Sequence, residues 1–422
     1  FGAIVGERVD GHNFVKDALV SGAVAVLATR KVDAPCVVVK SAEHIDGVIV
    51  ALGELAKHER KLLTEVNVIG VTGSSGKTST KDIIGQVLAQ HTPTCAPVGS
   101  PNNELGLPMT ILNAPTQTKN LVLEMGMRGR GHIRYLCEIA QPTIAVVTNV
   151  GVAHIGEVGT LADIVEAKAE LVEALPSSGL AILNADDENV RGMAKRTDAR
   201  VVTYGIEQPA DVSASALTVN VDASTSFTVT SKADSATVSL PLMGKHNVSN
   251  ALAAIAVGLN VGMTLQDCAE ALNSVELKSK WRMEKHNLKN NIVLINDAYN
   301  ANPDSMRAAI SALAALTTSH ERWLVVAGMH ELGSDSDAMH SEIGTAAALA
   351  GIEHVIVIGE TARPIASSAG EQAVWVPDRE SACDYIEKNI SQGDAILIKA
   401  SRSEGLEMVA EELIQRIGRA TA

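Results

Sequence analysis

A glycine-rich loop, TGSSGKT at residues 72–78, constrains this chain more than any other feature of its sequence. The apolar run that leads into the loop is typical of a buried strand, and a helical stretch follows it. Gly73 and Gly76 allow the backbone to curl, so that successive N–H groups point inward at phosphate oxygens. Lys77 can neutralise the terminal phosphates, and the Thr78 hydroxyl can ligate Mg²⁺. The sequence therefore predicts a nucleotide phosphate site between a strand and a helix.

One position of this loop departs from the general phosphate-loop pattern. Val71 occupies the place where that pattern has its first glycine. The alternative interpretation is a Gly/Ser-rich turn that contains Lys-Thr by chance. Because the loop lies between a strand and a helix, we favour the phosphate site.

The rest of the chain alternates short aliphatic strands with helices, which predicts parallel, doubly wound sheets. Residues 1–65 form a small unit, 66–283 a central unit with the phosphate loop, and 284–422 a third unit. Within the central unit, 212–242 alternates polar with apolar residues, as an antiparallel appendage would. The predicted fold class is α/β with three domains. These are a small N-terminal α/β domain, a central P-loop domain with a mostly parallel sheet, and a C-terminal Rossmann-like domain.

Composition restricts both the cores and the partners. Hydrophobic residues make up 46% of the chain and aromatic residues only 2%, so the cores must be aliphatic. A formal net charge of −14 leaves no broad basic surface, which excludes nucleic acid as a partner. Five scattered cysteines without a CxxC pair indicate free thiols in a reducing compartment. With no membrane span and no visible signal peptide, we expect a cytoplasmic protein, although the chain opens at Phe1 within what reads as a folded segment.

Two further side chains follow strands of the central unit. Glu124 ends the strand NLVLE, and His154 lies in the loop after TIAVVTNV. Both are therefore expected at the carboxyl edge of a parallel sheet, where ligands bind. A carboxylate and an imidazole beside a phosphate loop suit a divalent metal. The alternative is that each is a surface or structural residue.

Lys168 lies on the apolar stripe of the predicted helix 162–175, four residues after Ile164 and four before Val172. A buried lysine tends to lose its proton. The neutral amine can add CO₂ to become a carbamate, which is a good Mg²⁺ ligand. The alternative is a lysine whose ammonium extends to the surface.

Several polar residues in the second half of the chain are weaker candidates for ligand binding, because each stands alone after a predicted strand or at the start of a predicted helix. An asparagine amide in GKHNVSNALAAIA (244–256) can hold a purine edge, although helix capping explains one of them equally well. Asp297 can bind ribose hydroxyls, and Lys399 and Arg402 can bind a carboxylate or phosphate.

Together these segments resemble the Mur ligase family along the whole chain. The family order is TGSSGKT, NNELGLP, EMG, TNVGVAH, EAKAE, NADD, GKHNVSNALAA, WRME and KASRS. NDAYNANPDSM, NNELGLP and the opening VGERVDGHNF are similar to the branch of the family that adds a dipeptide. Other branches usually carry an AHNP-like or AHTP-like segment where this chain has YNANP.

The resemblance implies a role for each candidate site residue. Residues expected to bind the ATP phosphates are Thr72, Gly73, Ser74, Ser75, Gly76, Lys77, Thr78 and Arg282, with Asn247 near the adenine and Asp297 near the ribose. Residues expected to organise two Mg²⁺ ions are Thr78, Glu124, His154 and Lys168, the last matching a lysine that is carbamoylated in several members. Residues expected to take part in catalysis are Lys77, Lys168 and His154. Residues expected to face the UDP-linked substrate are Gly11, His12, Asn102 and Asn103, and those expected to face the incoming dipeptide are Asn300, Asn302, Lys399 and Arg402.

The implied activity is an ADP-forming ligase that joins D-alanyl-D-alanine to UDP-N-acetylmuramoyl-tripeptide through an acyl phosphate, in peptidoglycan precursor synthesis. We expect a monomer, and the third residue of the tripeptide can be lysine or diaminopimelate. One alternative is another Mur-type or folylpolyglutamate synthetase-like ligase that adds a single amino acid. A P-loop switch or motor is the alternative from another class, but the chain lacks the NKxD motif that a GTPase carries.

Three departures from the family pattern concern substrate contacts. The Ser/Thr-Asp-Ser-Arg segment expected to touch the uridine would precede Phe1. AGMHELG (327–333) replaces the usual GDM-x-ELG, and Ala400 replaces a glycine. We expect them to alter contact details rather than the chemistry.

The first prediction concerns the phosphate loop. Lys77→Ala should abolish ligase turnover and leave the fold intact, because it removes charge from a solvated loop and not from a core. Steady-state ADP release and far-UV circular dichroism measure the two effects. A variant that keeps more than a small fraction of the rate would contradict the phosphate-site assignment.

Overall fold

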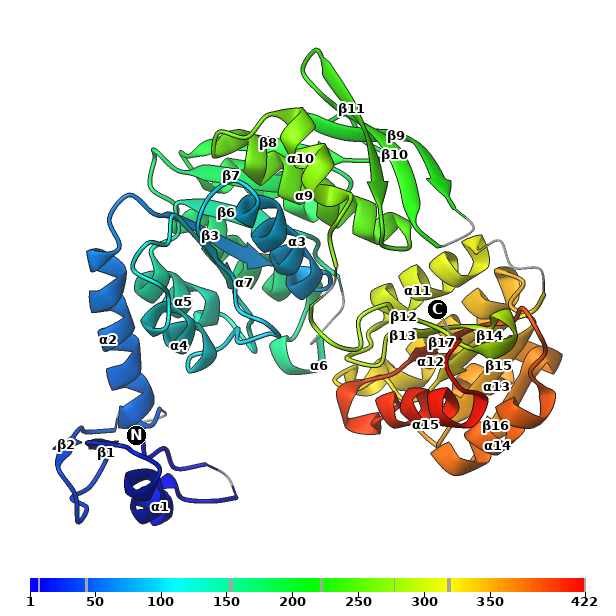
Figure 1. Cartoon of the computed structure of the whole chain (residues 1–422), viewed down its shortest axis with the longest axis horizontal. Helices are drawn as coiled ribbons and strands as arrows, with labels where there is room; N and C mark the ends of the chain where they lie inside the picture. The colour runs from blue at the N-terminus through cyan, green and yellow to red at the C-terminus, as the bar shows by residue number, and fades with distance from the viewer. Residues whose placement is uncertain are drawn as a thin grey trace.

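The strands of the chain form three separate sheets, shown in Figure 1. The computed structural model describes residues 1–6, 8–41, 45–151, 155–220, 223–276, 278–316 and 320–420. The α/β fold class predicted from the sequence is confirmed. No helix of the described residues is long and apolar enough to cross a membrane.

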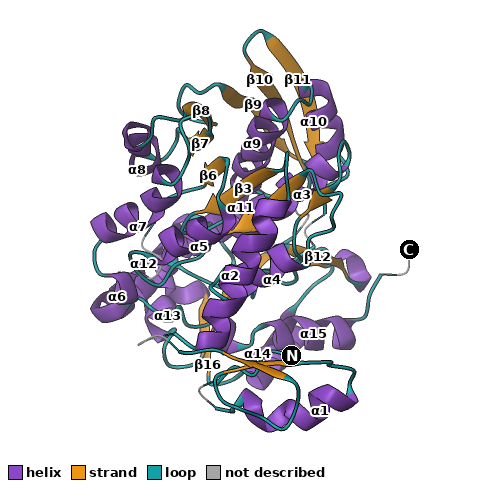
Figure 2. Cartoon of the chain, turned by 90° about the vertical axis from the view of Figure 1, so that its left-hand side faces the viewer, coloured by secondary structure: helices purple, strands orange, loops and turns teal. Residues whose placement is uncertain are grey.

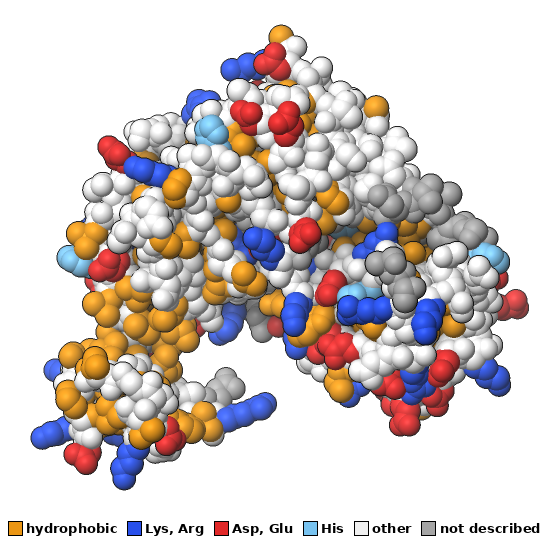
Figure 3. Space-filling view, in the orientation of Figure 1, with side chains coloured by type: hydrophobic (Ala, Val, Ile, Leu, Met, Phe, Trp, Pro, Cys, Tyr) orange, Lys and Arg blue, Asp and Glu red, His pale blue; other side chains and the backbone are white. Residues whose placement is uncertain are grey.

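The N-terminal part is small and thinly packed. It consists of α1 (Val15–Val20), the parallel pair β1 (Val26–Ala28) and β2 (Cys36–Val38), and α2 (Gly47–Leu62). Among the described residues, the hydrophobic cluster around its two strands consists of four buried side chains, those of Ala3, Val15, Val26 and Ala28. Apolar side chains gather on its surface in Figure 3, and α2 joins it to the rest of the chain. The Arg60 guanidinium fixes the end of α2 by donating to the carbonyl of Ala140 at 2.9 Å.

The central sheet has nine strands in the order β11-β10-β9-β8-β7-β6-β3-β5-β4. The strands are β3 (Asn67–Thr72), β4 (Thr94–Cys95), β5 (Asn120–Glu124), β6 (Ile144–Val147), β7 (Leu180–Asn184), β8 (Arg200–Gly205), β9 (Val212–Val219), β10 (Thr225–Ser231) and β11 (Asp234–Leu240). Strands β3 to β9 pair in parallel, whereas β10 pairs antiparallel with β9 and β11. The antiparallel appendage predicted over 212–242 is confirmed, and β9 joins it to the parallel part of the sheet.

Helices cover both faces of the central sheet, as Figure 2 shows from the side. The helices of this part of the chain are α3 (Lys77–Ala89), α4 (Gly106–Leu112), α5 (His132–Ala140), α7 (Leu161–Glu173), α8 (Glu188–Gly192), α9 (Lys245–Asn260) and α10 (Leu265–Leu272), together with the short α6 (Ile155–Val158), which lies beside the C-terminal part. Successive residues of a strand point to opposite faces. Ile69 therefore packs in one core with α3 and α9, while Val68 packs in another with α4, α5 and α7. Burial on both faces explains the continuous aliphatic runs.

The C-terminal sheet has six strands in the order β12-β13-β17-β14-β15-β16. The strands are β12 (Glu284–Asn287), β13 (Val293–Asn296), β14 (Arg322–Val326), β15 (His354–Ile358), β16 (Ala373–Val376) and β17 (Ala395–Lys399). The helices are α11 (Pro303–Ala315), α12 (Ser336–Leu349), α13 (Arg363–Ala369), α14 (Arg379–Asn389) and α15 (Glu407–Ile417). The edge strand β12 pairs antiparallel with β13, and the other described strands of this sheet pair in parallel.

Helix α3 holds the segment that leads from the central to the C-terminal sheet. The Gln86 amide donates to the carbonyl of Glu276 at 2.6 Å and accepts from its N–H at 3.1 Å. The Asp82 carboxylate accepts from the hydroxyl of Ser279 at 2.6 Å. The same helix begins at the phosphate loop, so one rigid element connects that loop to the base of the C-terminal part.

The second prediction concerns the contact between α12 and α13. A Cβ at Gly344 would lie 2.2 Å from the carbonyl oxygen of Ile365, and backbone atoms cannot move aside as a side chain can. Gly344→Ala should therefore lower the stability of the C-terminal part by about 1–3 kcal/mol, the usual range for overpacking. Urea unfolding followed by circular dichroism measures the change.

Gly192→Ala is the matched control, because a Cβ there meets nothing within 4 Å. Alanine also favours a helix over glycine by roughly 1 kcal/mol, so this control should be neutral or stabilising. Equal unfolding midpoints for the two variants would contradict the close helix contact.

Candidate active site

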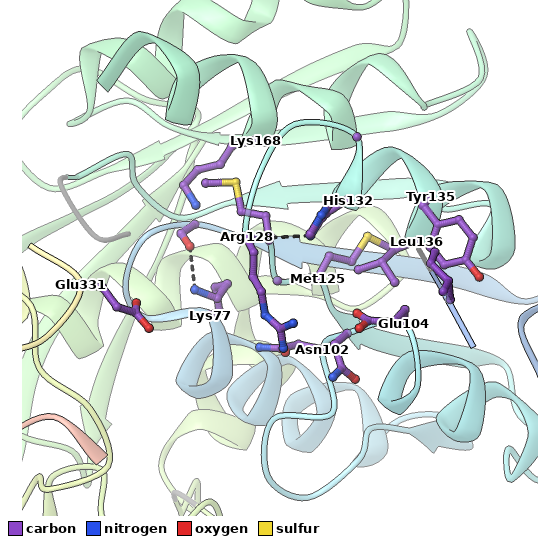
Figure 4. Close-up of a pocket in the computed structure, with 16 residues that line it drawn as sticks. Lys77, Asn102, Glu104, Met125, Arg128, His132, Tyr135, Leu136, Lys168 and Glu331 are labelled. Atoms are coloured by element: carbon purple, nitrogen blue, oxygen red, sulfur yellow. Dashed lines mark hydrogen bonds between the residues drawn. The ribbon is translucent and has the colours of Figure 1, made fainter. Parts of the chain in front are cut away.

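Two cavities meet at the phosphate loop, at the carboxyl edge of the central sheet. One, of about 380 Å³, lies between the loop and residues of the C-terminal part. The other, of about 610 Å³, lies between the loop and α5 and is drawn in Figure 4. Lys77 and Asn102 line both cavities. We call the first the loop cavity and the second the α5 cavity.

The phosphate loop has the curled backbone that its sequence predicts. Gly76 has φ 76° and precedes α3, and Gly73 has φ 155°. A Cβ at Gly73 would lie 1.8 Å from the Thr148 hydroxyl, so only glycine fits there. The N–H of Ser75 donates to the Asn149 side chain at 2.9 Å, which fixes the loop against the end of β6.

Lys77 lies between the two cavities and is half-buried. Its ammonium donates to the carbonyl of Gly73 at 2.8 Å, the dashed line in Figure 4. Burial lowers the pKa of this lysine, the negative charge of Glu124 opposes the shift, and Arg282 adds to it. Ser74 through Thr78 line the loop cavity, whereas Gly73 lines the α5 cavity and Thr72 is buried beneath.

The Glu124 carboxylate joins three segments of the chain. It is 1% exposed at the end of β5. The Thr78 hydroxyl donates to it at 2.7 Å, the Ser100 hydroxyl at 2.5 Å, and the Asn102 amide at 2.7 Å. Sequence patterns give no signal for Ser100, because it belongs to no periodic element.

The oxygen atoms of Thr78 and Glu124 fit a magnesium ion. Hydroxyl and carboxylate oxygens are ligands that Mg²⁺ prefers, and these two lie 2.7 Å apart beside the phosphate loop. Among the described residues, no group of three or more His, Cys, Asp or Glu side chains is placed to hold a metal. His154, which we predicted as a ligand, lies outside the described residues.

Lys168 is buried, as the apolar stripe of its helix predicts. Only 2% of it is exposed, and it lines the α5 cavity together with Lys77. A capping box of Thr160 and Asp163 fixes the start of α7. Desolvation, and then the charge of Lys77, holds the pKa of Lys168 well below its ordinary value. Within the described part of the chain its amine has no ion-pair partner, so the neutral form is favoured.

The far wall of the loop cavity contains the residues predicted near the nucleoside. The Asn247 amide donates to the carbonyl of Met243 at 2.9 Å. Arg282 lies over the Tyr299 ring at 4.0 Å, and its Nε is buried with no hydrogen-bond partner in the described residues. Asp297 accepts from the Lys399 ammonium at 2.7 Å. All except Met243 line the cavity, although they come from both the central and the C-terminal parts of the chain.

The residues predicted to face a dipeptide are only partly brought together. Asn300, Asn302 and Lys399 line the loop cavity. Asn302 also caps α11, accepting from the Ser305 N–H at 2.8 Å. Arg402 is absent from the lining of both cavities, and its guanidinium lies 4.2 Å from the centroid of the Trp281 ring.

Asn102 and Asn103 line the α5 cavity, but Gly11 and His12 belong to the N-terminal part. Asn103 caps α4 by accepting from the Gly106 N–H at 2.8 Å. His12 is buried, and its Nδ1 lies 2.7 Å from the Asp10 carboxylate. Neither Gly11 nor His12 lines either cavity.

The sequence patterns did not predict the role of Glu170, whose carboxylate binds the start of α5. The Glu170 carboxylate is buried on α7 and accepts from the N–H groups of Gly131 at 2.6 Å and Arg134 at 2.9 Å. A carboxylate at a helix N-terminus satisfies N–H groups that have no partner within the helix. Glu170 thereby fixes the wall that carries His132 and Tyr135. The motif EAKAE contains Glu170, but only the fold brings it to α5.

Comparisons with known proteins agree with this arrangement. A family model described as the Mur ligase middle domain matches residues 71–258, and one described as the Mur ligase, glutamate ligase domain matches 281–402. The UDP-N-acetylmuramoyl-tripeptide--D-alanyl-D-alanine ligase of Mycobacterium bovis is 40% identical over 98% of this chain and 89% of its own length.

Two solved structures are similar over almost the whole chain. The UDP-N-acetylmuramoylalanyl-D-glutamyl-2,6-diaminopimelate--D-alanyl-D-alanyl ligase of Acinetobacter baumannii has a TM-score of 0.85 and 30% identity, covering 98% of this chain and 90% of that one. MurF ligase of Thermotoga maritima, in complex with ADP, has a TM-score of 0.88 and 29% identity, covering 99% and 94%.

The third prediction follows from the burial of Lys168. Its lowered pKa means that the unfolded chain binds a proton that the folded chain releases, so wild-type stability should rise with pH up to the ordinary lysine pKa of 10.5. Lys168→Met removes this linkage and should be more stable than wild type at pH 7. The difference should shrink between pH 7 and 10.

Urea unfolding in bicarbonate-free buffer measures the difference, because added CO₂ would change the charge of the amine. Lys119→Met is the control, since 52% of the Lys119 side chain is exposed and its pair with Glu65 is at the surface. A pH-independent difference for Lys168→Met would contradict a neutral buried amine.

Proposed function

The chain belongs to the Mur ligase family, and from that premise we propose that it joins D-alanyl-D-alanine to UDP-N-acetylmuramoyl-tripeptide with ATP. It is an ATP-dependent, peptide-bond-forming ligase of peptidoglycan precursor synthesis. The observation that carries this assignment is the 40% identity to a ligase of that name over 98% of the chain. The two cavities that meet at Lys77 give such a ligase separate places for nucleotide and acceptor.

The chemistry requires an activated acceptor, because a carboxylate does not react with an amine directly. A carboxylate oxygen of the tripeptide attacks the γ-phosphorus of ATP, and the bond to ADP breaks. The dipeptide amine then attacks the carbonyl carbon of the acyl phosphate and loses a proton, and inorganic phosphate leaves. Such a transfer is catalysed mainly by positioning and by compensating charge.

Lys77 is placed to compensate charge on the phosphoryl group throughout the transfer. It borders both cavities, so its ammonium can reach the nucleotide side and the acceptor side. The N–H groups of Ser74 and Ser75 donate to Asn149, so the N–H groups of Gly76 and of the first residues of α3 would hold the remaining phosphate oxygens. Arg282 supplies a second cation in the loop cavity.

Thr78 and Glu124 would hold one Mg²⁺ ion, and Lys168 and His154 a second. Bound there, Mg²⁺ would withdraw charge from the phosphate oxygens. Lys168 suits this role as a carbamate, formed when its neutral amine adds CO₂ and loses a proton. Burial lowers the pKa of Lys168 and so favours the neutral amine, which is the form that reacts with CO₂.

Asn247 and Asp297 are proposed to hold the nucleoside, and Asn300, Asn302 and Lys399 the dipeptide. Lys399 is paired with Asp297 at 2.7 Å, which links the two sites through one ion pair. The roles of Arg402, Gly11 and His12 stay predictions from the family resemblance. So do the monomeric state and the cytoplasmic location.

We also propose that the domains divide at residues 65/66 and 283/284. Every strand of each sheet falls within one of the resulting segments, which supports this division. In this arrangement the C-terminal domain brings Asp297 and Lys399 to the phosphate loop, and it can exclude water from the acyl phosphate.

The fourth prediction tests the choice of amine. With ATP and UDP-N-acetylmuramoyl-tripeptide, D-alanyl-D-alanine should give an amide product together with ADP and phosphate, detected by mass spectrometry. D-glutamate, L-lysine and diaminopimelate should give none. An equal amount of product with a free amino acid would assign the chain to another branch of the Mur ligase family. Release of AMP in place of ADP would exclude an acyl phosphate intermediate.

A nucleotide-only control separates the ligase from a switch or motor. ATP alone should be hydrolysed far more slowly than ATP with both acceptor and dipeptide, because phosphoryl transfer needs the acceptor carboxylate. Equal rates of ATP hydrolysis with and without acceptor and dipeptide would favour a P-loop switch or motor.

A further inference from the structure

We propose that Arg128 binds a carboxylate of the acceptor peptide that does not itself react, and so helps to select and position the acceptor. The inference rests on the proposed function and deepens it. It concerns a residue to which neither the sequence motifs nor the phosphate loop assigns a role.

Arg128 projects into the α5 cavity from the loop between β5 and α5. Its backbone N–H donates to Nδ1 of His132 at 3.2 Å, which holds the base of the side chain in place. The side chain is exposed and lines the cavity with Lys77 and Lys168. Figure 4 shows the Arg128 side chain extending into the α5 cavity and away from α5.

The guanidinium of Arg128 is left without a partner in the described part of the chain. Its neighbours differ: Arg130 pairs with Asp163 at 3.0 Å, and Arg134 lies 3.9 Å from the carboxylate of Glu170. Those two pairs lie on the side of α7. Arg128 alone of the three lines the cavity.

The acceptor supplies the matching charge. The Acinetobacter baumannii relative is named for an alanyl-D-glutamyl-2,6-diaminopimelate peptide. A glutamyl residue within a peptide keeps one carboxylate free, and diaminopimelate has a second carboxylate besides the one that is activated. Either is an anion that must lie near the reacting group, and a guanidinium matches a carboxylate with two parallel hydrogen bonds.

We assign different roles to the cationic side chains that line the α5 cavity. Lys77 donates to the carbonyl of Gly73, and Lys168 lies close enough to Lys77 for their charges to interact. We infer that the reacting carboxylate meets the phosphoryl group beside these two amines. Arg128 comes from the loop between β5 and α5 and has no ion-pair partner among the described residues, so it is available for a carboxylate that stays bound through the reaction. Glu104 and Glu331 also line the cavity and present negative charge to the free amine of a lysine or diaminopimelate residue. This mixture of charges suits an acceptor with both free carboxylate and free amine.

Three acceptors distinguish the two possible carboxylates. The first is the tripeptide with D-glutamyl and L-lysyl residues, the second has D-isoglutaminyl in place of D-glutamyl, and the third has diaminopimelyl in place of L-lysyl. Each is assayed with the wild type, Arg128→Gln, Arg128→Lys and the control Arg130→Gln, which changes a cation of the same loop outside the cavity.

The fifth prediction is that Arg128→Gln raises the KM for the recognised acceptor about 10-fold or more and changes kcat little. A charge-assisted hydrogen bond present in both ground and transition states acts in this way. Arg128→Lys should recover part of the loss, and Arg130→Gln should behave as wild type. If Arg128 binds the glutamyl carboxylate, the wild type should have a lower KM for the first acceptor than for the second, and Arg128→Gln should lose this preference. If Arg128 binds the second carboxylate of diaminopimelate, the wild type should have a lower KM for the third acceptor than for the first, and Arg128→Gln should lose that preference instead.

An equal change in KM for all three acceptors, or none, would overturn the proposal. The proposed function is judged separately, because wild-type turnover of D-alanyl-D-alanine with any of these acceptors does not depend on the variant. Thermal unfolding of Arg128→Gln should match wild type, since the side chain is exposed and unpaired among the described residues.

Discussion

The carboxylate of Glu124 is the contact on which the candidate site depends. It accepts hydrogen bonds from Thr78, Ser100 and Asn102, which come from the phosphate-loop helix and from the segment before α4. A buried carboxylate is costly unless its oxygens are hydrogen-bonded, so these donors stabilise it and it fixes them in turn. Because Thr78 borders the loop cavity and Asn102 borders both cavities, one carboxylate connects the walls of the two cavities.

The parallel sheet explains why these groups meet. Strands β3, β5 and β6 pair in parallel, so their carboxyl ends lie at one edge and bring Thr72, Glu124 and Thr148 together. Helix α3 then extends from that edge to the linker, where Asp82 binds Ser279. Nucleotide phosphates at the start of α3 would thus be rigidly connected to the base of the C-terminal domain. This connection relates nucleotide binding to the placement of Asp297 and Lys399 across the loop cavity.

Local sequence patterns predicted the elements better than the contacts between them. The aliphatic runs 120–126 and 353–359 became β5 and β15, because strands covered on both faces need continuous apolar residues. The burial of Lys168 was predictable from helical periodicity alone. The pair of Lys399 and Asp297 joins residues 102 positions apart, and no local pattern encodes it. The same holds for Arg128, whose loop has no period, and for the clamp of Glu170 on α5.

The central claim is that the acceptor carboxylate attacks the phosphoryl group at Lys77, where the two cavities meet. The most direct measurement uses a UDP-N-acetylmuramoyl-tripeptide whose reacting carboxylate is labelled with ¹⁸O, followed by mass spectrometry of the released phosphate. The account predicts that each phosphate carries one labelled oxygen and that the new amide keeps the other. Phosphate without label would contradict direct transfer between the two cavities.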